Sequence, residues 1–258
     1  RPQGGPPMKL RLLSLLFLAI ATCDAGGSVR HDADALVALG AGISGTWETE
    51  FDFANPDSNN AVNVFVGEQP FPFVCVAAPC GIEYAPLPRN GTARIVTRSE
   101  DFAGFTGRLF VGADDAQEMP TVTARVINRA RPSQTIELPL YRRSTLVALN
   151  PLSLSFPGAE RTSTSHANLF VSEIGLSWEV AVLVEAYASS GERLGGEVHV
   201  IPRGETLVLQ DVLPRLGVTG LSQGQLRLTR TAGHGVMWGL LATVFDDGRV
   251  SVTAGKHP

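Results

Sequence analysis

Short runs of alternating apolar and polar residues, separated by turn residues, constrain the fold of this chain more than any other feature. In the run 47–53, Trp47, Phe51 and Phe53 share one face and acidic residues share the other, and the run 178–187, which starts at Trp178, repeats the pattern. A period of two residues is typical of a half-buried β-strand. Glycine and proline contribute 27 and 17 of the 258 residues, which favours many turns and few long helices. We therefore expect an all-β protein of mainly antiparallel strands.

The expected strands are short, and each is bounded by Gly, Pro, Asn or Asp. Residues 32–41 carry no strong signal and are interpreted as a short helix or a linker. Asn90-Gly91 and Asp247-Gly248 are dipeptides typical of two-residue hairpin turns. The expected strands are 47–53, 62–66, 93–98, 109–111, 121–128, 135–141, 152–156, 168–172, 178–187, 197–201, 206–210, 225–229, 236–245 and 249–253.

The two halves of the chain carry strands and turns in the same order. The turn Pro88–Thr92 has a counterpart in Pro202–Thr206, 114 positions later. Glu50–Phe53 has a counterpart in Asn168–Val171, 118 positions later. A nearly constant offset favours an internal duplication over accidental similarity between β-rich segments.

The strand density and the turns together suggest a family. About seven short strands per 100 residues are typical of a β-sandwich, with a barrel as the alternative. The segment Glu50–Val66, which contains Asn55-Pro56, and the turn Leu87–Thr92 resemble the immunoglobulin-like repeats of secreted bacterial surface proteins. In the second half, Ser172-Glu173 replaces the Asn-Pro pair. The resemblance implies two tandem immunoglobulin-like β-sandwiches that serve adhesion, spacing or binding and share no catalytic residues. The expected organisation is a leader at 1–25, a linker at 26–45, a first sandwich at 46–142 and a second at 143–258.

The first residues have the pattern of a secretory signal peptide. Lys9 and Arg11 follow Met8, and an apolar run occupies Leu12–Ala21. This run is too short for a membrane core that needs about 20 residues. Residues 1–7 precede this methionine, and the protein is expected to begin at Met8. The leader predicts an exported protein that is secreted, periplasmic or lipid-anchored at the cell surface, with no transmembrane segment after cleavage.

The cysteines supply one lipidation candidate and one disulfide candidate. Ile20–Cys23 resembles a bacterial lipobox, which would make Cys23 a lipid anchor, and cleavage after Ala25 is the competing interpretation. Cys75 and Cys80 enclose four residues in an exported chain, which favours a disulfide at the tip of a hairpin. A zinc site would need three or four ligands.

Motifs that could carry catalysis or bind a cofactor fail on their context. Gly40–Gly45 matches the dinucleotide fingerprint by its letters, but a β pattern follows where the fingerprint requires a helix. Ser44 lacks the glycine spacing of a nucleophile elbow. The five histidines are scattered, and Asp114-Asp115 and Asp246-Asp247 lack the spacing of a calcium loop. We therefore expect no enzymatic activity, no cofactor and no metal site.

A non-enzymatic interaction protein is the interpretation that remains. The net charge of -4 argues against nucleic-acid binding, which needs clustered cations. We expect a secreted or surface-tethered structural or adhesion-type protein whose partner is a protein or another component of the cell envelope. The alternative is a carbohydrate-binding or accessory module that takes a polysaccharide. For that alternative Tyr84 and Tyr141, near turns, are the candidate ligand contacts, because Trp47 and Trp178 fall on apolar strand faces.

Overall fold

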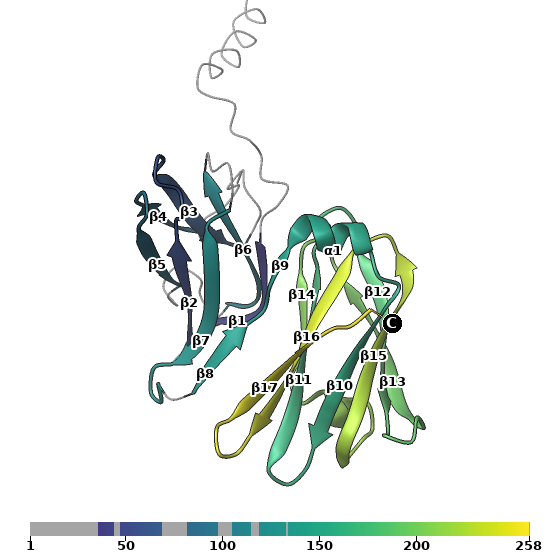
Figure 1. Cartoon of the computed structure of the whole chain (residues 1–258). Coiled ribbons are helices and arrows are strands. Elements are labelled where there is room, and N and C mark those ends of the chain that lie inside the picture. The colour runs from purple at the N-terminus through teal and green to yellow at the C-terminus, as the bar shows by residue number, and fades with distance from the viewer. Residues whose placement is uncertain are drawn as a thin grey trace, which may run out of the picture. The chain divides into compact units, whose positions relative to one another are not determined.

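Antiparallel sheets account for the fold (Figure 1). The structure, a computed structural model, describes residues 36–43, 47–68, 82–97, 105–114, 119–132 and 134–257. Within these ranges every strand pair is antiparallel. The predicted all-β, mainly antiparallel class is therefore confirmed. Four sheets form two modules, each with two sheets around an apolar core.

The N-terminal module consists of sheets A and B. Sheet A has the order β4-β3-β6-β1-β9, and sheet B has the order β5-β2-β7-β8. The strands are β1 (Leu36–Ile43), β2 (Trp47–Ala54), β3 (Val62–Gly67), β4 (Ile82–Leu87), β5 (Thr92–Thr97), β6 (Phe105–Asp114), β7 (Thr121–Asn128), β8 (Thr135–Leu138) and β9 (Leu140–Arg142).

The C-terminal module consists of sheets C and D. Sheet C has the order β10-β15-β12-β13, and sheet D has the order β14-β11-β16-β17. Its elements are α1 (Arg143–Leu149), β10 (Ser153–Arg161), β11 (Ser165–Glu173), β12 (Val180–Tyr187), β13 (Arg193–Ile201), β14 (Thr206–Leu209), α2 (Val212–Arg215), β15 (Leu221–Gly233), β16 (Met237–Phe245) and β17 (Val250–Ala254).

The two modules share one strand order. Sheet D repeats sheet B when β14, β11, β16 and β17 are matched to β5, β2, β7 and β8. Sheet C repeats four strands of sheet A, because β13-β12-β15-β10 matches β4-β3-β6-β1. The fifth strand, β9, lies against β1, and a bridge between Ser155 and Lys256 lies at the matching edge of β10. This is the topology that an internal duplication predicts.

The predicted counterpart turns occupy equivalent places in the two modules. Gly91 N–H donates to the carbonyl of Pro88, and Glu205 N–H donates to the carbonyl of Pro202, each at 3.1 Å. Asn90 has a φ of 47° and Gly204 a φ of 68°. The expectation of a hairpin at Asn90-Gly91 is wrong, because the turn carries the chain from β4 in sheet A to β5 in sheet B.

The second predicted hairpin is present. β16 and β17 pair across the turn at Asp247-Gly248, where Gly248 has a φ of 86°. The predicted strand 135–141 is divided at Pro139, with β8 in sheet B and β9 in sheet A. A proline has no N–H for the ladder, so it suits a crossing between sheets.

The linker predicted at 26–45 is wrong over its second half. Leu36–Ile43 forms β1, which lies between β6 and β9 in sheet A. Val37 and Ala38 are both fully buried, so this strand faces apolar surroundings on both sides and shows no alternation. The first residues of the dinucleotide-like motif lie in this strand, and from Trp47 onward a strand, β2, stands where the fingerprint requires a helix.

The prediction that Trp178 lies on the apolar face of a strand is also wrong. β12 begins only at Val180, and Trp178 lies in the preceding loop with 62% of its surface exposed. The apolar face of β12 is therefore formed by Val180, Val182, Val184 and Ala186, all fully buried. Trp238 lies in β16, a strand paired on both sides, and is 6% exposed.

A buried polar residue lies at the end of two equivalent strands, β2 in the N-terminal module and β11 in the C-terminal module. Asn55, after β2, donates from Nδ2 to the carbonyls of Pro88 and Asn60 and accepts from Asp57 N–H. Glu173, at the end of β11, is fully buried, and its carboxylate accepts hydrogen bonds from four backbone N–H groups. The donors are Gly175, Leu176, Gly204 and Val236. One carboxylate therefore ties together three loops at one end of the C-terminal module.

Two arginines compensate the charge of Glu173. Arg143 donates to the carbonyls of Ile174 and Gly175, on the loop that Glu173 holds. Arg108, on β6, is 3% exposed; burial lowers its pKa to about 10, against the attraction of Glu173 and then Glu68. A buried carboxylate of this kind is stabilising only while its donors and nearby cations stay in place.

We expect Glu173→Gln to lower the free energy of unfolding by about 2 kcal/mol, because the new amide nitrogen faces backbone donors and leaves one unpaired. Urea denaturation followed by circular dichroism measures the loss. Glu137→Gln, at an exposed position of β8, is the matched control and should change stability by less than about 0.5 kcal/mol. Equal effects of the two variants would contradict the proposed role of Glu173.

Candidate functional site

A cleft of about 410 Å³ lies between the core-facing side of sheet B and the outer face of sheet D. Its walls are mostly apolar. From the N-terminal module they include Trp47, Val126, Gln134, Ile136 and Leu138; from the C-terminal module they include Phe170, Leu240, Ala242, Val244, Val250 and Val252. These strands come from distant parts of the sequence, so the cleft exists only in the folded chain.

Strand register explains the apolar wall on sheet D. Phe170 lies opposite Leu240, and Val252 lies opposite Ala242, so successive outward positions of β11, β16 and β17 form one surface. Farther along the same face, Trp238 packs against Tyr141 of β9 with ring centroids 5.5 Å apart. The outer face of sheet D is therefore covered near Trp238 and open at the cleft.

A close approach of two turns borders the cleft. Gln134 lies before β8, and Asn128 donates from Nδ2 to its Oε1 at 2.8 Å. A side chain at Gly248 would meet the amide nitrogen of Gln134 at 1.7 Å. Gly248 also has a φ of 86°, so the turn favours glycine here, and a side chain would in addition displace the flexible end of Gln134.

The cleft continues into a polar hollow of about 480 Å³. His166, Asn168 and Gln210 line both spaces. The hollow adds Arg161, Thr162, Ser163, Ser165, Asp211 and Asp246. Asn168 accepts at Oδ1 from the backbone N–H of Asp211 at 2.9 Å. The combined site has an apolar part and a part rich in hydrogen-bonding groups.

The charges of the hollow are partly paired already. Arg161 binds Oδ2 of Asp211. The other oxygen of Asp211, Oδ1, is buried and has no hydrogen-bond partner within the described part of the chain. Asp246 adds a second acid to the lining. The hollow therefore contains one arginine, already paired, and two carboxylates, so its charged groups accept more hydrogen bonds than they donate.

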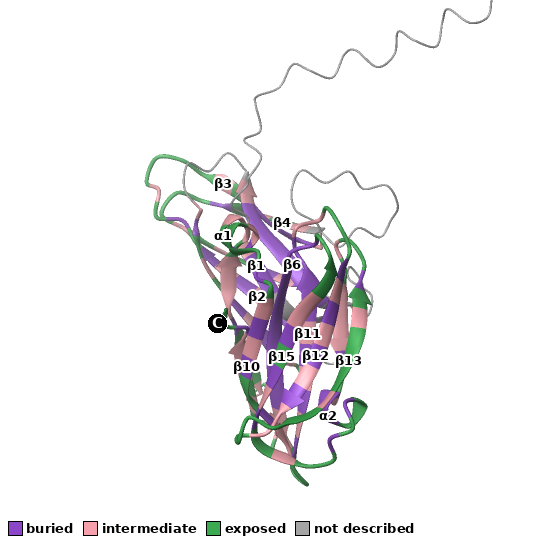
Figure 2. Cartoon of the chain, turned by 90° about the vertical axis from the view of Figure 1, so that its right-hand side faces the viewer, coloured by how far each residue is buried: buried purple, intermediate pink, exposed green. Residues whose placement is uncertain are grey.

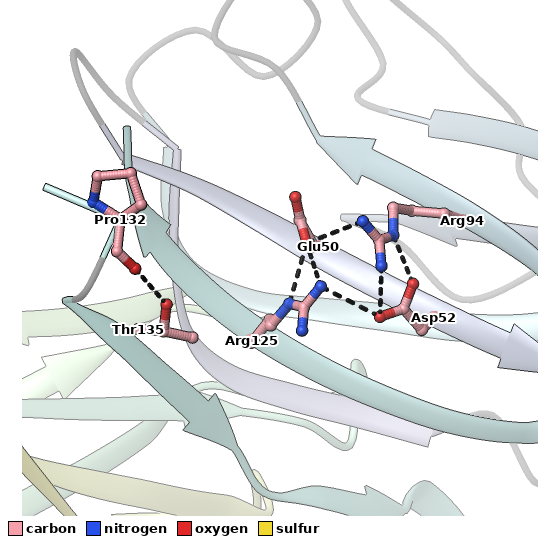
Figure 3. A network of polar contacts seen from close by, with 6 residues as sticks. All are labelled: Glu50, Asp52, Arg94, Arg125, Pro132 and Thr135. Carbon is pink, nitrogen blue, oxygen red and sulfur yellow. Dashed lines mark hydrogen bonds and ion pairs between the residues drawn. The ribbon is translucent and has the colours of Figure 1, made fainter. Parts of the chain in front are cut away.

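The outer face of sheet B has the opposite character to that of sheet D. Arg125 donates to Glu50 at 2.8 and 2.9 Å, and Arg94 donates to Asp52 at 2.5 Å (Figure 3). Longer ion pairs cross-connect these four residues. The network joins β5, β2 and β7 and balances two acids with two arginines. The acidic face expected for the run 47–53 is therefore a neutral ion-pair surface rather than a pair of free carboxylates.

The tyrosines expected to contact a ligand lie apart. Tyr84 is on β4 with 53% of its surface exposed, whereas Tyr141 is half-buried on β9 against the core of the C-terminal module. Burial raises the pKa of Tyr141. β4 and β9 are the opposite edges of sheet A, so the two rings form no common platform.

Two aromatic residues line the cleft, Trp47 and Phe170. Trp47 also packs against the core of the N-terminal module, as its place on an apolar strand face predicts, whereas the sequence predicts no role for Phe170. The available signal was the run 236–245, which is apolar on both faces and therefore requires a covered outer face. Trp178 and His234 lie in loops, where their rings pack edge to face with centroids 6.3 Å apart.

Several predictions concern residues outside the described ranges. The leader, Cys23 and the pair Cys75 and Cys80 lie there, so the signal peptide, the lipid anchor and the disulfide stay predictions. Within the described ranges, His, Cys, Asp and Glu form no group of three close enough to hold a metal ion. Neither of the two short helices assigned there is long and apolar enough to cross a membrane.

Comparison with known proteins adds little. No protein-family model and no curated protein sequence matches the chain. Among solved structures, a lectin of Pleurotus ostreatus in its apo form is similar with a TM-score of 0.23 and 8% identity, over 86% of this chain and 75% of that chain. The lectin from Pleurotus ostreatus in complex with GalNAc gives a TM-score of 0.21 and 10% identity, over 86% and 76%. At these TM-scores the similarity establishes neither a fold nor a function for this chain.

We expect Tyr141→Ala to lower the free energy of unfolding by about 3 kcal/mol, because the ring packs on Trp238 and leaves a cavity when removed. Tyr84→Ala, at an exposed edge strand, should cost less than about 1 kcal/mol. Thermal and urea unfolding of both variants test this difference. A Tyr141→Ala variant as stable as the parent would instead favour the ligand-contact role predicted from the sequence.

Proposed function

We propose that this chain is a non-enzymatic binding protein of the extracytoplasmic space that takes a neutral amphipathic ligand in the cleft between sheets B and D. Its two modules serve as immunoglobulin-like sandwiches that hold the two walls of the site. The observation that carries the proposal is the joined site of an apolar cleft and a polar hollow. An amphipathic component of the cell envelope, such as a glycolipid, has the matching chemistry.

The apolar cleft supports the binding of an alkyl or similar apolar group. Small-molecule sites are usually concave, mostly apolar, about 300–1,000 Å³ in volume and often at domain junctions. The cleft of about 410 Å³ lies in this range. Each Å² of apolar surface that a ligand removes from water contributes roughly 25 cal/mol. An apolar group seated between Phe170 and Ile136 would therefore supply most of the affinity.

The polar hollow supports a neutral head group with hydroxyl or amide groups. Asn168 and Gln210 supply amide donors and acceptors, and the unpartnered Oδ1 of Asp211 can accept one more hydrogen bond. An anionic head group is disfavoured, because Asp211 already neutralises Arg161 and Asp246 lies in the same lining. Sugar hydroxyls suit this set of groups. In this proposal, the carbohydrate of the alternative interpretation is the head group of the ligand.

The arrangement of charged groups supports binding rather than catalysis. The acids on the outer face of sheet B are each paired with an arginine. His166 lines the hollow. Gly220–Gly224 matches the letters of a nucleophile elbow, but Ser222 lies within β15 and not on the strand-to-helix turn that such an elbow requires. The proposal therefore assigns recognition, not bond breaking, to the site.

Octyl glucoside below its critical micelle concentration is a suitable probe, because it joins an alkyl chain to a neutral sugar. We expect it to change tryptophan fluorescence saturably, since Trp47 lines the cleft. Trp178→Phe should keep this signal, because Trp178 is exposed in a loop away from the lining residues. Glucose alone should give no signal, since it lacks the apolar group.

A matched pair of variants locates the binding. Ala242→Phe fills the cleft and should weaken octyl glucoside binding at least about tenfold, or about 1.4 kcal/mol. Ala232→Phe adds the same ring at an exposed position of β15 and should leave binding unchanged. Binding that survives Ala242→Phe, or that is lost in both variants, would place the ligand elsewhere and overturn the proposed site.

A further inference from the structure

β13 is an edge strand with an unusually apolar outer face. It pairs with β12 on one side, and sheet C ends there (Figure 2). Val198 and Val200 are 56% and 58% exposed, and Leu194 is 36% exposed. Within the described residues β13 holds the outer end of sheet C, so its second row of backbone N–H and C=O groups is available for pairing.

The other long edges carry features that oppose pairing. β4, the counterpart of β13 in the N-terminal module, is shorter and contains Pro86, which has no N–H to offer. β10, at the far edge of sheet C, contains Pro157 and is bridged at Ser155 by Lys256. β13 has neither proline nor lysine. It therefore lacks two of the usual protections against strand addition, and its one bulge, at Leu194, lies at the start of the strand.

The regular part of β13 is self-complementary. A register shift opposite Ala186 and Tyr187 makes Leu194 a bulge, so the regular segment is Gly195–Ile201. Pro202 ends this segment, and its midpoint is Val198. An antiparallel copy centred on Val198 uses the whole segment. Val198 then faces itself, and Val200 faces Gly196 of the second copy.

The polar side chains of β13 favour the same register. In the copy centred on Val198, Glu197 faces His199 of the second copy, and the reverse pair forms across the axis. Within one chain the same two side chains come no closer than 3.5 Å and form no hydrogen bond. A register centred on Glu197 would place the two carboxylates opposite each other, which is destabilising. The arrangement centred on Val198 avoids this repulsion and offers each buried His199 Nε2 a carboxylate as a hydrogen-bond partner.

We propose that two copies of this chain associate through β13, paired antiparallel about a two-fold axis at Val198. The association joins two four-stranded C sheets into one continuous sheet. It covers the exposed valines on both copies and satisfies the open edge of each. A two-fold contact of this kind closes on itself, so the product is a dimer rather than a filament.

The oligomeric state of the purified chain tests the proposal. Analytical ultracentrifugation over a concentration series should show a monomer–dimer equilibrium. Val198→Lys places two cations at the axis and should weaken dimerisation at least about tenfold. Leu152→Lys, at a position that is 63% exposed outside β13, is the control and should leave the equilibrium unchanged. A chain that stays monomeric at all concentrations would overturn the proposal.

The Glu197–His199 pairs give a second test on the same equilibrium. Glu197→Lys removes the carboxylate that accepts a hydrogen bond from His199 of the second copy and should weaken the dimer severalfold. Glu192→Lys, an exposed substitution of the same type just before β13, should not. Equal effects of the two substitutions would show that net charge, rather than the pairing about Val198, controls association.

Crosslinking tests the register itself. Val198→Cys places two thiols opposite each other at the axis, so oxidation should give a covalent dimer on a non-reducing gel. Val200→Cys faces Gly196 and should crosslink far less. The parent chain, with its three native cysteines, supplies the background. Crosslinking through position 200 in preference to 198 would contradict the proposed axis.

Discussion

The apolar outer face of sheet D is the constraint on which the arrangement of this protein depends. A sheet that faces water on one side normally alternates apolar and polar residues, but β16 is apolar on both faces and nearly all buried. Its outer side must be covered. Tyr141 covers it at Trp238, while the part formed by Leu240, Ala242 and Val244 lines the cleft. The same property that holds the modules together therefore also creates the candidate site.

The duplicated modules differ where their roles differ. Equivalent strands have become a neutral ion-pair surface on sheet B and an apolar surface on sheet D. The buried position after β2 and at the end of β11 holds Asn55 in one module and Glu173 in the other. The amide binds its neighbours without charge, whereas the carboxylate needs the nearby arginines Arg108 and Arg143. Charge at this position thus links the C-terminal loops to a residue of sheet A.

Alternation and turn residues sufficed to predict the all-β class, most strand positions and the equivalent turns at Pro88 and Pro202. They failed where burial came from long-range packing. β1 is buried on both faces and looked like a linker, and Trp178 belongs to a loop because β12 starts two residues later. The cleft could not be predicted from the sequence for the same reason, since its walls come from strands far apart in sequence. The two-faced run of β16 was the one local sign that its sheet is covered.

Sheets C and D leave the C-terminal module with two different surfaces for association. Sheet D lines the cleft with side chains, whereas the β13 edge of sheet C offers backbone groups framed by Val198 and Val200. Recognition through side chains selects a ligand by shape and polarity, and recognition through an open edge selects any strand of matching register. The proposed partner for that edge is a second copy of the same chain, because Gly195–Ile201 can pair antiparallel with itself about Val198. The two surfaces belong to opposite sheets of one module, so occupation of one leaves the other accessible.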